Sequence, residues 1–313
     1  MTDEPRTVHI PVLLDAILDH CPLSPGQKVI DCTFGGGGYT SAFLAAEAQV
    51  LALDQDATAL QRRPDLTESY PRTFFTHHTS FTELTDVLST LGWPGADLIV
   101  ADLGFSSDQL DDPTRGFSYQ AATEGAFPLD MRMHNTGPTG ADMLNRLTEH
   151  ELTTLFRTLA DEPRAKPLAR QIVTQRTAQP FATTADFLHA IEVVYPPRAG
   201  LHRRHPAQRL FQALRMEVNQ ELPALEALLP QARDALNPGG TLAMVTFHSL
   251  EDRMVKNFMR DQCTPTRDHI GRETAKSPFY QPKRKVEPTV TEVEANPRAR
   301  SATLRLLRRR QDA

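Results

Sequence analysis

The feature that most constrains the fold is a short apolar run that ends on a carboxylate and is followed by four consecutive glycines. Val29 and Ile30 precede Asp31, and the glycines occupy Gly35 to Gly38. Glycine lets the backbone adopt positive φ and approach a ligand closely, and a helix beginning near Gly38 would direct free N–H groups at an anionic group. This order predicts a nucleotide-type cofactor site. The alternative interpretation is a flexible surface loop.

Residues 27–110 alternate strand-like apolar runs with amphipathic stretches, which predicts a parallel sheet with right-handed crossovers. Ligands bind beyond the carboxyl ends of the strands in such sheets, so Asp31, Asp54 and Asp102 are expected to converge on one crevice. The candidate strands are Lys28 to Asp31, Val50 to Asp54, Phe74 to Thr76 and Asp97 to Asp102.

The pattern changes after Asp111. Residues 111–138 are rich in Pro, Gly and Asp and predict a long ordered loop. Residues 142–194 have helical periodicity only, with expected breaks at Pro163, Pro180 and Pro196.

A strand signal returns at residues 241–247, after a turn at 237–240. We therefore predict an α/β fold, with a Rossmann-like domain formed by residues 1–110 and 216–313. Residues 111–215 would form an inserted loop plus helical domain.

Composition excludes several classes of protein. No apolar stretch approaches the length of a membrane span. The segment Met1 to Pro5 lacks the regions of an export signal, so we expect a cytoplasmic protein. Cys21, Cys32 and Cys263 are too few and too scattered for a disulfide framework or a Cys-rich zinc site, and we predict no metal.

The formal net charge is −5, but basic residues gather locally. No acidic residue lies between Glu192 and Glu217, and further basic runs occupy residues 283–285 and 298–310. Solvated faces would explain any one of these runs, whereas together they favour a localised track for a polyanion. The first run contains Arg198, His202, Arg203, Arg204, His205, Arg209 and Arg215.

Asp54 closes the second candidate strand, where related folds keep an acidic residue for the ribose hydroxyls. Asp56, two residues later, is predicted to cap the next helix. Thr40 stands where the third glycine of a dinucleotide fingerprint belongs, and no P-loop Lys follows the glycines. S-adenosylmethionine (AdoMet), which has an adenosine diol, a carboxylate and an ammonium, remains as the cofactor.

Asp102 ends the fourth candidate strand, where a methyltransferase acting on an amino group carries its reactive-side motif. The lone pair of an exocyclic base amine is delocalised into the ring, and a carboxylate bonded to its N–H can localise it for in-line transfer. We infer a catalytic role for Asp102. The alternative is a residue that only caps the following turn.

His248 and Ser249 do not form a hydrolase site, because no Gly-x-Ser-x-Gly elbow surrounds Ser249. Ser249, followed by Asp252 three residues later, is predicted to be a helix cap. His248 is predicted to line the crevice at the end of its strand.

The chain resembles, along nearly its whole length, the bacterial 16S ribosomal RNA cytosine-N4 methyltransferases, the RsmH/MraW family. Eight segments carry the resemblance in the order of the family. They are residues 9–15, 31–35, 102–111, 115–118, 128–133, 205–207 with 211–215, 247–253 and 296–302.

The resemblance implies an AdoMet-dependent enzyme whose helical insertion recognises the substrate, a single cytosine in the decoding region of 16S rRNA. Phe81 would stack on adenine. The chain departs from the family at Tyr39, which stands where the family has His, at Ala16, which replaces Glu, and in a longer segment 119–127. The cofactor set is Gly35 in the glycine turn and, by resemblance, Gly37, Gly38, Tyr39, Asp54, Phe81, Asp102 and Gln109.

The resemblance also gives an expected partner, 16S rRNA within the small subunit, and leaves a homodimer open. The target base would leave its stack to reach Asp102, and the arginines of the first and C-terminal runs, with His205 and His248, would contact RNA. Phe211 and Leu214 are expected to be core residues instead.

Two alternatives to an rRNA methyltransferase stay open. One is a DNA amino-methyltransferase, which is disfavoured because residues 102–105 contain no proline. The other is a non-catalytic ribosome-assembly factor.

Overall fold

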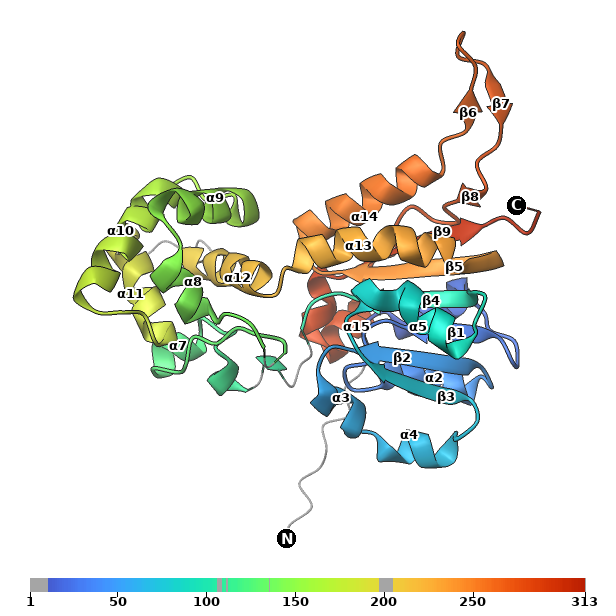
Figure 1. The fold of residues 1–313 in the computed structure, drawn as a ribbon, viewed down its shortest axis with the longest axis horizontal. Coiled ribbons are helices and arrows are strands. Elements are labelled where there is room, and N and C mark those ends of the chain that lie inside the picture. Colours follow the sequence, from blue (N-terminus) through green and yellow to red (C-terminus); the bar gives the residue numbers. More distant parts are fainter. Residues whose placement is uncertain (1–10, 106–108, 111, 135, 197–204, 313) are drawn as a thin grey trace. The chain divides into compact units, whose positions relative to one another are not determined.

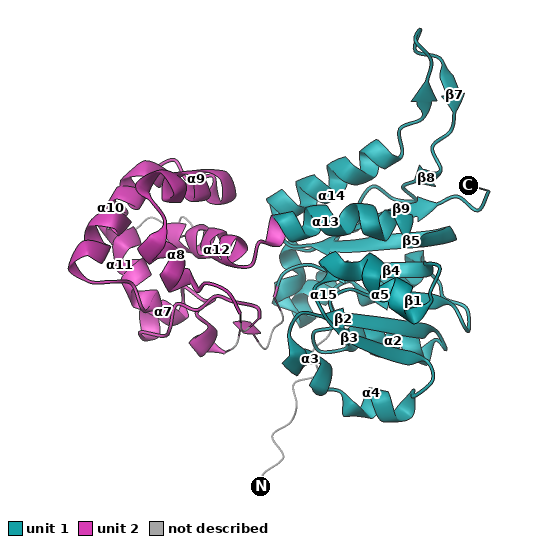
Figure 2. Cartoon of the chain, viewed as in Figure 1, with its two compact units in different colours: residues 1–104, 223–313 teal, residues 105–222 magenta. Residues whose placement is uncertain are grey.

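The computed structural model describes residues 11–105, 109–110, 112–134, 136–196 and 205–312 (Figure 1). The chain forms two compact units (Figure 2): unit 1 is residues 1–104 with 223–313, and unit 2 is residues 105–222. The sequence suggested boundaries at 110/111 and 215/216. The observed ones differ because Phe105 packs on the core of unit 2 and Arg215 is paired with Glu221 in that unit.

Unit 1 is built on a seven-stranded sheet of order β3-β2-β1-β4-β5-β9-β8. The first five strands are parallel, whereas β9 runs antiparallel to β5 and to β8. The predicted α/β class with a mostly parallel sheet is confirmed. The strands are β1 (Lys28–Asp31), β2 (Gln49–Asp54), β3 (Phe74–His78), β4 (Ala96–Asp102), β5 (Leu236–Thr246), β8 (Phe279–Tyr280) and β9 (Thr303–Arg309).

Both faces of this sheet are covered, which explains why its strands read as continuous apolar runs. Val29 and Ile30 are both fully buried, yet they belong to clusters on opposite faces. The first face packs against α1 (Leu14–His20), α2 (Gly38–Ala45), α3 (Ala57–Gln61) and α4 (Pro64–Ser69). The second packs against α5 (Leu84–Leu91), α13 (Glu221–Asp234) and α14 (Ser249–Gln262).

The structure differs from the predicted turn at residues 237–240. These residues lie within β5 as an irregularity in its pairing with β4, not as a separate turn before it. Beyond α14 the chain forms a separate two-stranded sheet, β6 (Thr266–Arg267) with β7 (Glu273–Ala275). The remaining elements are η1 (Phe81–Glu83), α15 (Val290–Ala295) and η3 (Pro297–Ser301).

Unit 2 is helical. The predicted breaks at Pro163 and Pro180 are confirmed, and an unpredicted one falls at Thr148, which caps α9 in a reciprocal box with Glu151. Phe211 and Leu214 are buried in its core, as predicted. Its elements are η2 (Pro113–Arg115), α7 (Ala121–Glu124), α8 (Gly140–Arg146), α9 (Glu149–Ala160), α10 (Ala165–Ala178), α11 (Thr184–Val194) and α12 (Pro206–Val218).

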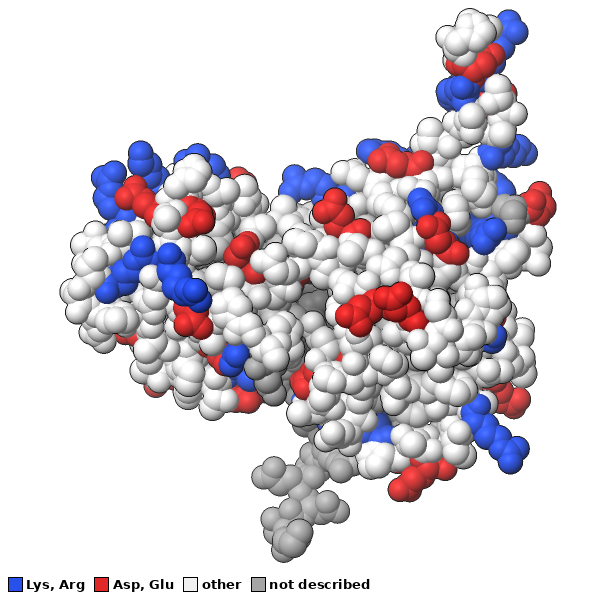
Figure 3. Space-filling view, in the orientation of Figure 1, with Lys and Arg blue, Asp and Glu red and all other residues white. Residues whose placement is uncertain are grey.

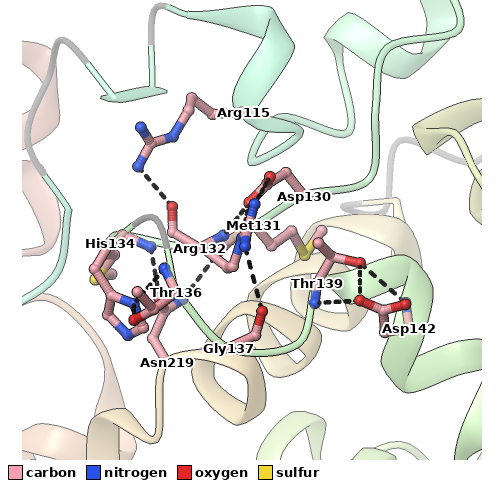
Figure 4. A network of polar contacts seen from close by, with 11 residues as sticks. Arg115, Asp130, Met131, Arg132, His134, Thr136, Gly137, Thr139, Asp142 and Asn219 are labelled. Atoms are coloured by element: carbon pink, nitrogen blue, oxygen red, sulfur yellow. Dashed lines mark hydrogen bonds and ion pairs between the residues drawn. The ribbon is translucent and has the colours of Figure 1, made fainter.

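The segment that precedes α8 is ordered by polar contacts (Figure 4). Asp130 and Arg132 form an ion pair of 2.7 Å, and Arg115 Nη2 donates to the Arg132 carbonyl at 2.6 Å. The Asn219 amide donates to the Met131 carbonyl at 2.7 Å and accepts from the Met133 N–H at 2.7 Å. These bonds supply the backbone partners that an irregular segment lacks. None of the described helices is long and apolar enough to cross a membrane.

Candidate active site

The glycine turn joins β1 to α2, which begins at Gly38 as predicted. Gly37 has φ +73°, and a Cβ there would lie 2.8 Å from the Phe34 ring; at Gly38 a Cβ would lie 2.4 Å from Pro11. Packing inside the protein therefore requires both glycines. At Gly35, φ +52°, a Cβ would meet nothing closer than the Thr33 carbonyl at 3.9 Å. Space above the turn is thus open at Gly35.

Asp54, at the end of β2, is bound to this turn. Its Oδ2 accepts the Gly35 N–H at 2.9 Å and its Oδ1 accepts the Asp56 N–H at 2.8 Å. Burial raises the pKa of the Asp54 carboxyl, and these two N–H groups oppose that shift. Each oxygen keeps a lone pair for a further donor, so the carboxylate suits a ribose diol. Asp56 caps α3 through the Thr58 N–H, as predicted.

Asp31 lies beneath the turn and is fully buried. The Thr40 hydroxyl donates to its Oδ2 at 2.7 Å, and the Thr33 N–H donates to its Oδ1 at 3.2 Å. Burial raises the pKa of the Asp31 carboxyl to about 6. Thr40, which replaces the third glycine of a dinucleotide fingerprint, therefore ties α2 to the end of β1. This role of Thr40 was not predicted from the sequence.

Asp102 ends β4, and its N–H donates to the Thr33 hydroxyl at 2.7 Å. Its Oδ1 is buried and has no hydrogen-bond partner among the described residues. Burial, and then the charge of Asp31, raise the pKa of the Asp102 carboxyl well above its usual value; the nearby Tyr39 hydroxyl opposes this shift, and the charge of Glu251 adds to it. An unsatisfied buried oxygen is costly, and an N–H from a ligand would relieve that cost.

Tyr39 directs its side chain into the core below the turn. The ring is 4% exposed, stacks on Phe43, and its hydroxyl donates to the Val12 carbonyl. Burial, followed by the charges of Asp102 and Asp31, raises the pKa of this phenol well above its usual value, so it stays neutral. The same interaction places the Tyr39 hydroxyl near Asp102. Contact of Tyr39 with the cofactor stays a prediction.

Two other predicted cofactor residues lie in different units. Phe81 begins η1 just after β3 and is partly buried against the second face of the sheet. Gln109 belongs to unit 2, where its amide donates to the Met133 carbonyl at 3.2 Å. Contact of either residue with the cofactor stays a prediction.

A family model described as the MraW methylase family matches residues 6–310. The chain belongs to the MraW methylase family. The predicted family and the predicted enzyme class, a methyltransferase, are thereby confirmed, and with them AdoMet as the cofactor. The orphaned Asp102 oxygen, the open space at Gly35 and the Asp54 carboxylate all fit this cofactor.

Curated relatives are similar over almost the whole chain. Proteins named ribosomal RNA small subunit methyltransferase H from Brucella anthropi and Brucella suis are each 42% identical over 303 residues, covering 95% of this MraW methylase and 86% of the relative. A putative methyltransferase from Streptococcus mutans, solved in complex with SAH, has a TM-score of 0.41 at 13% identity and covers 96% of this chain and 99% of its own. The fold assignment depends on the observed strand order and the family, not on that structure.

The predicted RNA contact of Arg215 is wrong for this MraW methylase. Its guanidinium donates two bonds to Glu221, at 2.7 and 2.8 Å, and lies 4.5 Å from the centre of the Phe105 ring. Only 10% of the side chain is exposed, so it cannot reach a phosphate. Arg215 instead holds the end of α12 to the unit 2 core.

The other residues of the first basic run differ in whether their side chains can reach RNA. The ring of His205 accepts the Ala207 N–H, caps α12 and stacks on Tyr119, so it has a structural role, and its contact with RNA stays a prediction. Arg209 is 45% exposed while bound to buried Glu162 at 2.8 Å, and stays a candidate for RNA contact. Arg198, Arg203 and Arg204 lie outside the described residues.

The C-terminal arginines were expected to hold phosphates, and for buried Arg305 this is wrong. Arg305 forms a bidentate pair with Asp252, at 2.6 and 2.8 Å. Arg308 donates to the His20 carbonyl and Arg309 to the Leu236 carbonyl, but both side chains are half-buried and their contact with RNA stays a prediction. These side chains anchor β9 to the surrounding elements of unit 1. Arg298 and Arg300, in η3, are exposed.

Ser249 is the first residue of α14 rather than its cap, which is His248. No side chain caps the first turn of α14, so the predicted cap is wrong; Glu251 instead accepts the N–H of Phe247, the residue before the cap position, at 3.2 Å. His248 Nε2 lies 2.8 Å from Glu251 Oε1, and its Nδ1 has no hydrogen-bond partner in the described part of the chain. Glu251, buried beside the Asp102 carboxyl, was missed although it lies within the segment 247–253 that carried the resemblance.

Proposed function

We propose that this chain methylates the exocyclic N4 amine of one cytosine in 16S rRNA. The single observation that supports this most is Asp102, whose buried Oδ1 has no partner within the described residues at the carboxyl end of β4. The names of the curated relatives supply the class of substrate, small-subunit rRNA. The cytosine and its position come from the family resemblance.

The cofactor supplies an electrophilic methyl group when it is bound. Asp54 and the backbone of the glycine turn would hold its ribose and polar ends. Asp102 Oδ1 would accept an N–H of the target amine, which localises the nitrogen lone pair. The same oxygen takes that proton as the new N–C bond forms, and the raised pKa of Asp102 makes it a better proton acceptor than an ordinary aspartate.

We also propose that unit 2 recognises the RNA and that the reaction takes place in the cytoplasm on an assembled small subunit. A localised run of basic residues in a chain of net charge −5, with Arg209 still exposed, suits docking to a shaped particle more than non-specific binding along RNA.

The test mixes purified protein and labelled AdoMet with small subunits from cells that lack this enzyme, with naked 16S rRNA and with duplex DNA. We expect label in N4-methylcytidine of the RNA, lost with Asp102→Asn and kept with the exposed control Asp86→Asn. Label in DNA would favour the DNA alternative. Cofactor binding without transfer to any of the three would favour an assembly factor.

A further inference from the structure

An arm, defined as residues 264–285, follows α14. Its β6 and β7 strands pair only with each other, and the arm projects from the end of α14 (Figure 1). Every described residue from 266 to 276 is exposed except Asp268. A two-stranded hairpin without a hydrophobic face gains little stability from its own contacts. The arm therefore adds surface to unit 1 without adding core.

The tip of the arm is nonetheless fixed by local hydrogen bonds. Asp268 Oδ1 accepts the N–H groups of Ile270 at 3.0 Å and Arg272 at 2.8 Å, and the Asp268 N–H donates to the Arg272 carbonyl at 2.9 Å. Gly271 has φ +83°, the left-handed conformation that closes such a turn. This geometry holds Ile270 outward with 59% of its surface exposed.

The base of the arm is attached to the body of unit 1. The Ser277 hydroxyl donates to the Gln262 carbonyl at the end of α14 and accepts the Phe279 N–H. Arg310 donates to the Ser277 carbonyl at 3.0 Å and stacks on Tyr280. A fixed base and a fixed tip mean that a partner of the arm would order few additional residues, which lowers the entropy cost of binding.

The charge of the arm contrasts with that of the whole chain. It carries six basic side chains and two acidic ones, in a protein of net charge −5, and one of the two acids, Asp268, is engaged in the turn. Figure 3 shows Lys and Arg atoms along the arm. The six basic residues, all exposed, are Arg267, Arg272, Lys276, Lys283, Arg284 and Lys285.

We propose that this arm binds the sugar-phosphate backbone of folded RNA, with Ile270 against the ribose and base edges of a shallow minor groove. The inference depends on the proposed rRNA substrate. Cations spread along a narrow projection match phosphates along a strand, and Lys285, which pairs with Glu287, is the member of the six already engaged by an acid. RNA minor grooves are wide and shallow, so a short apolar side chain can reach the sugars there.

The test measures binding of naked 16S rRNA and, in parallel, of small subunits, without AdoMet, over a range of salt concentrations. The arm variant is Arg272→Gln with Lys276→Gln, and the matched control removes two exposed cations elsewhere on unit 1, Arg72→Gln with Arg260→Gln. We expect the arm variant to bind about 10-fold more weakly and its log–log salt slope to fall by about 2, roughly one per lost phosphate contact, while the control barely changes. Ile270→Ser is expected to weaken binding several-fold with an unchanged slope.

Equal affinity and equal slope for the arm variant and the control would overturn the proposal. A loss seen with small subunits but not with naked rRNA would overturn it in favour of a ribosomal protein as the partner. Unchanged AdoMet affinity and thermal melting would show that the variants are folded. Because binding is measured without transfer, absence of methylation by the wild type would contradict the proposed function while leaving the binding result to be judged alone.

Discussion

The Gly35 N–H donates to Oδ2 of Asp54 at 2.9 Å, which ties the glycine turn to the end of the neighbouring strand β2. A second N–H, from Asp56, holds the other carboxylate oxygen. The carboxylate is therefore held in place before any ligand arrives, and little side-chain entropy would be lost when it binds a diol.

Replacing Asp54 with Ala is expected to weaken AdoMet binding by about 10- to 100-fold, because hydrogen bonds to a charged group contribute about 1.5–3 kcal/mol. Isothermal titration with AdoMet measures the effect. Asp56→Ala is the control: it removes the α3 cap and lowers stability by about 1 kcal/mol, with affinity kept within a factor of two. Equal losses of affinity in the two variants would mean that Asp54 acts only by supporting the turn.

Asp102→Asn is expected to lower kcat by about 10²- to 10⁴-fold with AdoMet still bound, because an amide cannot take the proton of the amine. The pH profile provides a second test. Burial raises the pKa of Asp102 above its usual value, and only the carboxylate can act as base, so wild-type kcat/KM should rise as pH increases through that raised pKa. The residual activity of the variant should lack this rise. An identical rise in both would assign it to another group.

The raised pKa of the Asp31 carboxyl can be tested by measuring stability alone, without activity. Its pKa is about 6 in the folded protein against 3.8 for an ordinary aspartate, so the folded state binds the proton more tightly than the unfolded state. The resulting stabilisation is complete below pH 3.8 and is lost as pH rises through 6. The two-unit difference corresponds to about 3 kcal/mol.

Asp31→Asn removes this titration, so the variant should gain up to about 3 kcal/mol relative to wild type between pH 4 and pH 8. Urea unfolding at the two pH values measures the change, with exposed Asp86→Asn as the control. A difference from wild type that is constant with pH would show that Asp31 does not titrate in this range.

The elements that the sequence predicted well are those set by local pattern. The strand ends at Asp31, Asp54 and Asp102, the helix start at Gly38 and the Asp56 cap all depend on residues within a few positions of each other. Apolar runs and cap chemistry are local signals, so one sequence suffices to recognise them.

Predictions failed where a distant partner decides the role of a residue. Arg305 reads as a surface cation in a basic run, but it pairs with Asp252, 53 positions away. Ser249 is a residue type that often caps helices, yet it is the first residue inside α14, and Glu251 links the helix to the preceding chain through the Phe247 N–H. Buried ion pairs leave no periodic signal, and a basic run therefore indicates the amount of charge without indicating its exposure.

Arg215 allows the difference between a charged residue and an exposed charged residue to be measured. Its guanidinium forms two bonds with Glu221 and lies over Phe105, and each partner in the ion pair is only 10% exposed. Arg215→Met should destabilise the protein by about 3–5 kcal/mol, because it leaves the Glu221 carboxylate buried and unpaired. Thermal and urea unfolding measure this loss.

The double variant Arg215→Met with Glu221→Leu should recover most of the stability, since removing both charges also removes the desolvation cost. Binding of 16S rRNA by the double variant should equal that of wild type, because a guanidinium enclosed by Glu221 and Phe105 is not available to a phosphate. A stable double variant with weakened RNA binding would restore the role that the basic run suggested. A double variant as unstable as the single one would show that Arg215 acts mainly through its stacking on Phe105 and not through its charge.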